Sequence, residues 1–454
     1  MHTWDDDTEE LAHSVVGYAV ERLRNPKDPA WGAVGREALA AALDGAICPN
    51  GIGGPAALAL ATDVIIPSCR PMDDPLNLAY VPTAPTIAAT MFDLVVSASS
   101  IMACNWESGA GAIAAENQAL RWLADLAGYP ADAGGVFVSG GSAANLSALV
   151  TARSVYRSRH SVEGQRLAFA ITAEAHSSVR AAAHVMDAAI INVAGDERGA
   201  MTAKNLAAAL DSAGPTVAAF AVVATGGTTN GGIVDDLDGI ATVCTERGIW
   251  LHVDGAYGLA ALVAPSVRSL FTGIERSDSF GVDPHKWLFA PYDCAALVYR
   301  DPQPAAIAHA QHGDYLEAID RREWNPSDYA YHLSRRARGL PMWFSLATYG
   351  TAAYTNAIEV TLRTARGIAD AIRTRAFLEL ILAPELSVVL FRRVGWTDAQ
   401  YHAFSISRAK AGVALIVPTK WHGKTVLRIC VINPRTTVAD VAAVLDDLAS
   451  DIRP

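Results

Sequence analysis

Residues 134–153, GGVFVSGGSAANLSALVTAR, decide the fold class. A short apolar run leads into a glycine-rich turn, and a segment with helical composition follows it. The same order recurs in residues 168–186, 218–232 and 248–262. Short apolar strands that alternate with helices predict an α/β protein with a mainly parallel sheet covered on both faces. Ligands bind such sheets at the carboxyl ends of the strands.

The flanking segments have other patterns. Residues 8–45 predict two helices with a break near RNPKDPAWG, and the Gly/Pro-rich passage 49–86 predicts loops that lie over another surface. Residues 301–333 predict a long loop of the kind that is functional or mobile. A long helix from Met342 to about Arg375, three strands and a last helix predict a small C-terminal α+β domain. The predicted units are an N-terminal helical and strap segment (1–86), a large cofactor-binding domain (87–342) and a small domain (343–454).

Composition excludes several classes of protein. The chain has 454 residues, of which 51% are hydrophobic and 18% charged, and its net charge is −11. No basic cluster is present, which argues against nucleic-acid binding. The N-terminus has no signal-peptide pattern, and the longest apolar stretch is shorter than the ~20 residues that span a bilayer. We therefore expect a soluble, cytoplasmic protein.

The cysteines do not indicate a disulfide framework or a metal site. All six are widely scattered, without a C-x-x-C motif or a His/Cys cluster. This spacing predicts reduced cysteines in the core.

The segment SGGSAAN, residues 139–145, lies between a predicted strand and a predicted helix. Two glycines let the backbone approach an anion, and the start of the helix supplies free N–H groups. Ser142 adds a hydroxyl. A plain structural turn is an equally good interpretation of this segment taken alone, because it matches neither of the common glycine-rich phosphate motifs.

Asp254 ends the apolar run WLHVD. A carboxylate at the end of a buried strand can hold a proton on a bound heteroaromatic ring. A helix N-cap or a turn is the alternative. Gly255 and Ala256 beside it are small, and we expect them to leave room for a flat ring.

Lys286 lies within the otherwise apolar stretch DPHKWLF, residues 283–289. Burial would lower its pKa, and a neutral amine can form a Schiff base. A lysine that extends from a strand end to solvent is the alternative. An anion cradle, a carboxylate and an amine at strand ends of one sheet together match pyridoxal phosphate, which has a phosphate, a pyridine nitrogen and an aldehyde.

The chain resembles the group II pyridoxal-phosphate-dependent amino acid decarboxylases, which include the aromatic-L-amino-acid, histidine and glutamate decarboxylases. The stretches that carry the resemblance are HVDGAYG (252–258), AHSSV (175–179), SRRARGLPMWF (334–344) and HKW (285–287). It implies fold type I, the aspartate-aminotransferase-like architecture. It also implies decarboxylation of an L-amino acid, with the cofactor bound to a lysine as a Schiff base.

The resemblance also implies a role for each matching position. These are Lys286 as the Schiff-base lysine, His285 beside it, Asp254 at the pyridine nitrogen, His176 and Ala256 on the two ring faces, Gly141 and Ser142 at the phosphate, Thr229 near the ring oxygen, and Tyr315 as the proton donor on the long loop. Taken singly, His176 also fits a core histidine, Thr229 a turn hydroxyl and Tyr315 a surface residue. Many relatives have Asn where this chain has Asp283, so we expect Asp283 either to turn away from the phosphate or to bond to a donor.

Substrate choice rests on a few further positions. The segment LAYVPT resembles the pocket of aromatic decarboxylases, and the residues proposed to surround the substrate are Tyr80, Val81, Pro82, Thr83, Trp106 and Arg428. These positions favour an aromatic L-amino acid, and Tyr80 and Trp106 fit a core role equally well. Alternatives are aldehyde-forming oxidative deamination and decarboxylation of an aliphatic or acidic amino acid. The family implies a homodimer with shared active sites and an N-terminal strap.

Overall fold

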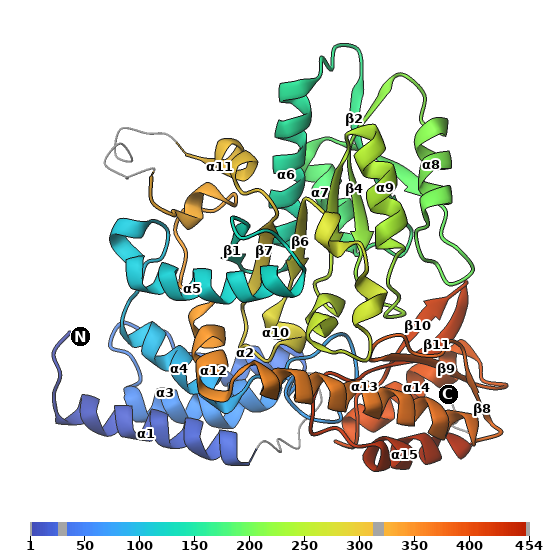
Figure 1. Cartoon of the computed structure of the whole chain (residues 1–454). Coiled ribbons are helices and arrows are strands. Elements are labelled where there is room, and N and C mark those ends of the chain that lie inside the picture. The colour runs from blue at the N-terminus through green and yellow to red at the C-terminus, as the bar shows by residue number, and fades with distance from the viewer. Residues whose placement is uncertain (1, 26–33, 312–321, 451–454) are drawn as a thin grey trace.

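The computed structural model describes residues 2–25, 34–311 and 322–450. A large sheet with helices on both faces forms the upper part of the molecule in Figure 1, with the small C-terminal sheet at the lower right and the N-terminal helices below. Tyr315 and its neighbours 312–321 lie outside the described residues. The three-part division at 86/87 and 342/343 stays a proposal, and the second boundary falls inside a helix (Leu340–Tyr349).

The large sheet is mainly parallel, which confirms the predicted fold class. Within the described residues its strand order is β1-β7-β6-β5-β4-β2-β3. Strand β7 is antiparallel to both β1 and β6, and the remaining pairs are parallel. The strands are β1 (Gly134–Val138), β2 (Arg166–Thr172), β3 (Ala189–Val193), β4 (Val217–Thr225), β5 (Trp250–Asp254), β6 (Ser279–Val282) and β7 (Ala295–Tyr299).

Apolar side chains on both faces hold the sheet between its helices. On β4, Val222 and Ala224 face one buried cluster, whereas Ala221 and Val223 face the other. Because both faces are covered, every residue of β5 and β7 is buried, and the strands appear in the sequence as continuous apolar runs. The helices of this part are α4 (Ile87–Ala98), α5 (Trp106–Leu126), α6 (Gly141–Arg159), α7 (Ser177–Met186), α8 (Ala203–Ser212), α9 (Leu237–Arg247), α10 (Pro284–Trp287), α11 (Gln303–His309) and α12 (Leu340–Tyr349).

A second, antiparallel sheet lies in the C-terminal part, in the order β10-β11-β9-β8. The predicted single helix from Met342 to Arg375 is wrong in one respect. It is two helices that meet at Gly350, whose φ of 76° lies in the left-handed region that favours glycine. The elements are α13 (Thr351–Arg373), β8 (Leu378–Leu380), β9 (Val388–Arg393), α14 (Asp398–Lys410), β10 (Val417–Trp421), β11 (Lys424–Cys430) and α15 (Val438–Asp446).

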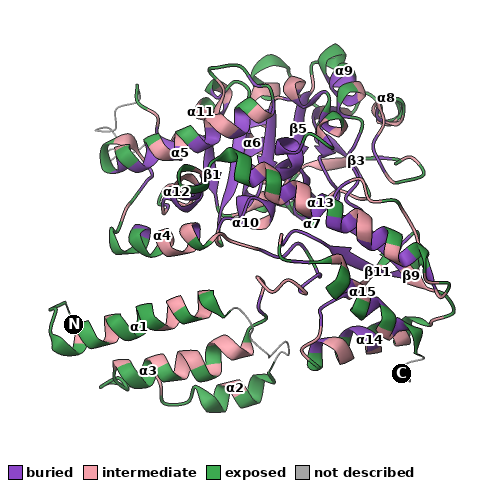
Figure 2. Cartoon of the chain, turned by 60° about the horizontal axis from the view of Figure 1, so that its bottom comes forward, coloured by how far each residue is buried: buried purple, intermediate pink, exposed green. Residues whose placement is uncertain are grey.

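The N-terminal part is a layer of helices. The two predicted helices are present as α1 (Asp6–Arg24) and α2 (Arg36–Ala42). The passage 49–86 was predicted as loops, but it contains α3 (Gly54–Leu60) and further helical turns up to Ser68. None of these three helices has a fully buried residue, and Figure 2 shows them set apart from the purple core.

Burial tests the prediction for the cysteines. Cys104, Cys244, Cys294 and Cys430 are buried free thiols, but Cys48 and Cys69 are exposed, so the prediction of six core cysteines is wrong for these two. Of the helices that the structure describes, none has the length and apolar character needed to cross a membrane.

Candidate active site

The candidate site lies at the carboxyl ends of β4, β5 and β6, beside the first turn of α6 (Figure 1). Asp254 is the last residue of β5, and Asp283 follows β6 directly. The backbone N–H of Asp283 donates to the carbonyl of Ala256 at 2.9 Å, which joins the two strand ends. The topology therefore brings together residues that lie far apart in the sequence, as expected for a parallel sheet.

Lys286 lies on the short helix α10, and its neighbour Trp287 fixes that helix. The indole of Trp287 is fully buried, stacks on Tyr257 at 5.1 Å between ring centroids, and donates to Thr361 Oγ1 at 3.0 Å. The Lys286 side chain is not packed into the core as Trp287 is, because 22% of it remains exposed. The apolar surroundings of this lysine thus anchor the turn that presents the amine.

The amine of Lys286 forms an ion pair. Its Nζ lies 2.8 Å from Asp283 Oδ2, whose side chain is only 2% exposed. Burial by itself would lower the pKa of Lys286, but the Asp283 carboxylate and its hydrogen bond outweigh burial and hold the pKa above its ordinary value. The predicted lowering of this pKa is therefore wrong for the protein as described, because the sequence did not reveal the carboxylate as a partner.

His285 is buried beside the same carboxylate. Its Nε2 lies 3.6 Å from Asp283 Oδ2, and its Nδ1 accepts the backbone N–H of Cys294 at 3.1 Å. Burial lowers the pKa of His285, so the neutral ring is favoured and its proton lies on Nε2. Tyr292 contacts this ring at 4.6 Å between centroids and has no distinctive sequence pattern, so the sequence analysis missed it.

Asp254 is held from two sides. Its Oδ2 accepts Asn145 Nδ2 at 2.9 Å, and its Oδ1 accepts the backbone N–H of Ala256 at 3.2 Å. The side chain is buried, with 4% of the residue exposed. Hydrogen bonds to both oxygens fix the orientation of this carboxylate.

His176 is joined to the same group of side chains. It caps the start of α7, and its Nδ1 lies 2.8 Å from Ser178 Oγ. Ser178 Oγ in turn accepts Asn145 Nδ2 at 3.1 Å. His176 itself is exposed, so one end of this chain of hydrogen bonds is accessible to a ligand.

The predicted phosphate loop is the start of α6. No side chain caps this helix, and the N–H groups of Ala143 and Ala144 donate to the carbonyl of Gly140, so those of Gly141 and Ser142 are the ones offered to an anion. A Cβ added to Gly141 would lie 3.0 Å from Ala256 Cβ and 3.2 Å from Asp283 Oδ2. Gly141, Ala256 and Asp283 therefore converge, and Ser142 is exposed beside them.

Thr229 and Arg428 lie together. Arg428 is 6% exposed, and its Nε donates to the carbonyl of Thr229 at 2.9 Å. Its Nη1 donates to the carbonyl of Tyr80, and among the described residues its Nη2 has no hydrogen-bond partner. The arginine thus joins β11 of the small domain to the loop after β4 and to the predicted substrate segment.

The predicted substrate residues divide into two groups. Tyr80 is 56% exposed with a φ of 56°, whereas Val81, Pro82 and Thr83 are buried. Val81 packs in the main core cluster, which is the ordinary structural role. Trp106 begins α5 and packs on a separate cluster that includes Val96, Ala103 and Ile113, so the structure gives it a core contact.

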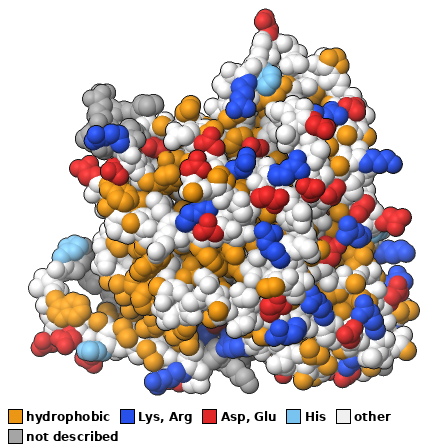
Figure 3. Space-filling model, viewed as in Figure 1, with side chains coloured by type: hydrophobic (Ala, Val, Ile, Leu, Met, Phe, Trp, Pro, Cys, Tyr) orange, Lys and Arg blue, Asp and Glu red, His pale blue; other side chains and the backbone are white. Residues whose placement is uncertain are grey.

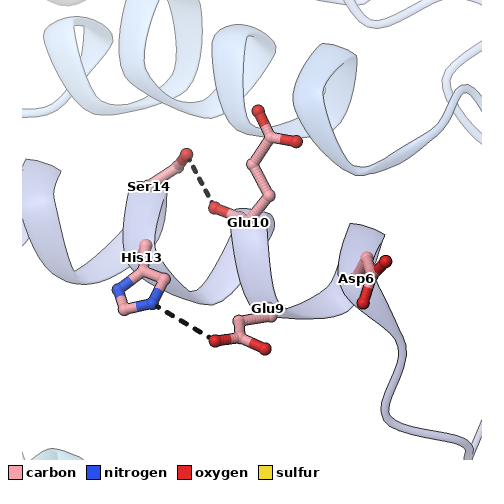
Figure 4. A pocket seen from close by; sticks show the side chains of 5 residues that line it. All are labelled: Asp6, Glu9, Glu10, His13 and Ser14. Carbon is pink, nitrogen blue, oxygen red and sulfur yellow. Dashed lines mark hydrogen bonds and ion pairs between the residues drawn. The ribbon is translucent and has the colours of Figure 1, made fainter.

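A hollow on α1 does not have the character of a catalytic site. It is lined by Asp6, Glu9, Glu10, His13 and Ser14, all from one helix (Figure 4). His13 Nε2 lies 3.8 Å from Glu9 Oε1, with the two side chains 82% and 59% exposed. Neighbours on one exposed helix surface do not converge on a ligand. No group of metal-ligating side chains occurs in residues 2–25, 34–311 and 322–450 either.

The residues at the sheet edge fit pyridoxal phosphate. Lys286 supplies an amine, Asp254 a fixed carboxylate for the pyridine nitrogen, and the uncapped start of α6 supplies N–H groups for the phosphate. Asp283 is unfavourable for this fit, because within the described residues its Oδ1 is buried without a hydrogen-bond partner. Its other oxygen bonds to Lys286, so of the two alternatives stated for Asp283 the structure shows the bond to a donor.

Two residues that matter for this geometry were missed from the sequence. Asn145 is 1% exposed and His252 is fully buried, and Asn145 Oδ1 lies 2.9 Å from His252 Nε2. Both lie inside the motifs SGGSAAN and HVDGAYG. Their position within those motifs was the available signal, but only the structure shows that they meet.

Comparison with known proteins gives a consistent result. Residues 58–394 match the family model described as the pyridoxal-dependent decarboxylase conserved domain. An aromatic-L-amino-acid decarboxylase of Bacillus atrophaeus is 29% identical, over 97% of this chain and 94% of the relative. An L-2,4-diaminobutyrate decarboxylase of Rhizobium meliloti is 31% identical, over 89% of this chain and 83% of the relative.

Solved structures share the fold. The structure of Oryza sativa TDC with PLP and tryptamine superposes with a TM-score of 0.89, at 24% sequence identity, and covers 99% of this chain and 98% of that one. A likeness of this kind confirms the fold type I architecture that the sequence predicted.

Proposed function

The chain belongs to the pyridoxal-dependent decarboxylase family and acts on an amino acid with pyridoxal phosphate, and from this premise we propose that its substrate is an aromatic L-amino acid. The relative from Bacillus atrophaeus, which matches nearly the whole chain, is named for that activity. The observation that carries the choice is the exposed ring of Tyr80, whose backbone carbonyl is held by Arg428. An exposed aromatic ring offers a stacking surface to an aromatic side chain.

Charge argues against a cationic substrate. The relative from Rhizobium meliloti is named for 2,4-diaminobutyrate, whose side chain ends in an ammonium group. Here the charged group beside Tyr80 is the guanidinium of Arg428, which repels an ammonium. Arg428 Nη2, without a partner among the described residues, instead favours an acidic amino acid as the second candidate.

We further propose the following roles for the residues of the site. Bound pyridoxal phosphate supplies the electron sink for the bond between Cα and the carboxylate. Asp254 holds a proton on the ring nitrogen, because both its oxygens are fixed by donors. Lys286 would hold the cofactor through its amine, which would have to be neutral for this, and Asp283 Oδ2 at 2.8 Å orients the amine and controls its protonation.

Other residues would cover the two faces of the cofactor ring and return a proton to Cα of the substrate. His176 and Ala256 cover the two ring faces, and Gly141 and Ser142 receive the phosphate. Because Nδ1 of His176 is directed at Ser178, its Nε2 is the atom presented outward. Tyr315, assisted by His285, donates the proton to Cα, and Thr229 lies near the ring oxygen.

One experiment tests the proposal. The holo-protein is incubated with tryptophan, tyrosine, phenylalanine, glutamate, aspartate and 2,4-diaminobutyrate, and carbon dioxide, amine and peroxide are measured together. We expect amine and carbon dioxide in equal amounts, with the highest kcat/KM for an aromatic substrate. A higher kcat/KM for glutamate or diaminobutyrate would refute the substrate class. Ammonia and peroxide would point to the aldehyde-forming alternative.

We also propose that the protein is a cytoplasmic homodimer. The support for the dimer is a set of exposed apolar side chains, which includes Val15 and Ile47 in the N-terminal part and Leu94 and Val95 on α4. In Figure 3, hydrophobic side chains gather at the lower left of the face shown, over α4. Large exposed apolar patches mark protein interaction sites, and a second copy of the chain is the partner we propose.

A further inference from the structure

Asn145 occupies the centre of a buried hydrogen-bond network. The catalytic and cofactor-binding roles proposed so far do not involve this network. The chain begins at Trp250 Nε1, which donates to Ser279 Oγ at 3.0 Å. Ser279 Oγ lies 2.9 Å from His252 Nδ1, and His252 Nε2 lies 2.9 Å from Asn145 Oδ1. All four residues are at most 9% exposed.

On its other side Asn145 reaches the candidate active site by two arms. One hydrogen of its Nδ2 goes to Asp254 Oδ2 at 2.9 Å. The other goes to Ser178 Oγ at 3.1 Å, and Ser178 continues to His176 Nδ1 at 2.8 Å. One amide therefore joins the carboxylate proposed for the ring nitrogen to the histidine proposed for the ring face.

The chemistry of the two ends fixes the direction of every bond. An indole N–H can only donate and a charged carboxylate can only accept. Asn145 Nδ2 therefore donates to Asp254, its Oδ1 accepts the Nε2–H of His252, and Nδ1 of the neutral His252 ring accepts the Ser279 hydroxyl. Asn145 must then turn its oxygen to His252 and its nitrogen to Asp254, because the flipped amide would place oxygen against oxygen.

His252, which lies within this hydrogen-bond network, stays neutral. Burial lowers the pKa of His252 to about 4, although the nearby Asp254 carboxylate acts in the opposite direction. A neutral ring with its proton on Nε2 is the form that locks the amide in place. In a protonated His252, Nδ1 would carry a hydrogen and could no longer accept the Ser279 hydroxyl.

We propose that Asn145 is a positioning residue for the decarboxylation, and that it sets Asp254 and His176 together through its one amide group. The Asn145 side-chain amide offers two N–H donors and one carbonyl acceptor in one plane. These are the groups that the bonds to Asp254, Ser178 and His252 require. The inference rests on the proposed roles of Asp254 and His176 toward the cofactor. The new element is that Asn145 couples the role of Asp254 to the role of His176.

The coupling is tested with substitutions at Asn145, which disturb both arms, and with a substitution at Ser178, which removes only the His176 arm. Asn145→Asp keeps the shape but places a carboxylate against Asp254, and Asn145→Leu removes all the hydrogen bonds. We expect both to raise the Kd for pyridoxal phosphate about tenfold or more, since hydrogen bonds to a charged group are lost. Ser178→Ala cuts only the His176 arm, so we expect kcat to fall while the Kd for the cofactor stays within about threefold.

Thr151→Val is the matched control. Thr151 is a fully buried polar residue on the same helix, and its hydroxyl bonds to the carbonyl of Ser147 and the ring of His309 instead of the site. A purely structural role lowers the Tm of apo- and holo-protein together, as we expect for Thr151→Val. A positioning role reduces the rise in Tm that saturating pyridoxal phosphate produces, as we expect for the Asn145 variants.

Each outcome decides the proposal. If Asn145→Asp and Asn145→Leu bind pyridoxal phosphate within about twofold of the wild type, the coupling does not exist. If both fail to fold, Asn145→Thr, which keeps one donor, is measured in their place. An intermediate Kd supports the proposal, and a Kd like the wild type overturns it. Failure of the proposed substrate class would leave these cofactor measurements unaffected.

Discussion

At the scale of single residues, the pairing of Lys286 with Asp283 is the feature with the most direct chemical consequence. The ammonium and carboxylate lie 2.8 Å apart in a largely buried position. The partner raises the pKa of the amine, although burial alone would lower it. The reactive, neutral amine is therefore less available at neutral pH than burial alone would make it.

This predicts a pH dependence for loading of the apo-protein. The rate at which Lys286 captures pyridoxal phosphate should rise with pH, because the neutral amine becomes more abundant as the pH approaches its raised pKa. In Asp283→Asn the carboxylate is lost and burial dominates, so the pKa falls. We expect the rate profile to move to lower pH. Stopped-flow absorbance of the Schiff base measures it.

Asp293→Asn provides the control for that shift. Asp293 is a nearby carboxylate that pairs with Arg338 at 2.8 Å, not with Lys286. Its removal should leave the profile in place. A profile that does not move in Asp283→Asn would show that the ion pair does not set the reactivity of Lys286.

The residues of the site were only partly predictable from the sequence. Lys286 and Asp254 have recognisable neighbours on the chain, so their positions followed from local patterns. Their partners did not, because Asp283 and Asn145 act through contacts that the fold alone creates. A motif indicates which residue types are present but not which of their atoms meet.

At the scale of elements, β5 and the turn after it show how a strand delivers the site. Side chains alternate along a strand, so Trp250, His252 and Asp254 share one face. The sequence predicted this strand, but its continuous apolar pattern could not show which face carries the hydrogen bonds. It also suggested that Gly255 leaves room for a ring. The structure corrects that, because a Cβ there would lie 1.9 Å from Leu259 Cγ.

Gly255→Ala should therefore destabilise the turn rather than narrow the cofactor site. The added methyl group overpacks the helical turn Gly258–Val263, and we expect the free energy of unfolding to fall by about 1–3 kcal/mol. Urea denaturation of the apo-protein measures the change. Gly111→Ala on α5, where a Cβ would meet nothing within 4 Å, should be neutral or slightly stabilising. Equal stability of Gly255→Ala and the wild type would count against this packing role.

At the scale of the whole molecule, the sheet and the helices α1 and α2 were predictable, but the packing partner of the N-terminal layer was not. Alternating apolar strands and helices indicate parallel order, and β2 to β6 follow it. The apolar run of β7 does not encode direction, and β7 proves antiparallel. The helices α1, α2 and α3 bury no residue completely within the chain, so their packing partner lies beyond what one chain's pattern can show.

The homodimer proposal makes the last prediction. On α4, over which Figure 3 shows hydrophobic side chains gathered, Leu94 and Val95 are 48% and 50% exposed. We expect the wild type to sediment at twice 47.9 kDa. Leu94→Asp with Val95→Asp should raise the dimer Kd at least about 100-fold, because the interface would bury two unpaired charges. Ile406→Asp on α14, also 55% exposed, should leave the dimer intact. A monomeric wild type, or a double variant as dimeric as Ile406→Asp, would show that this surface does not join two copies.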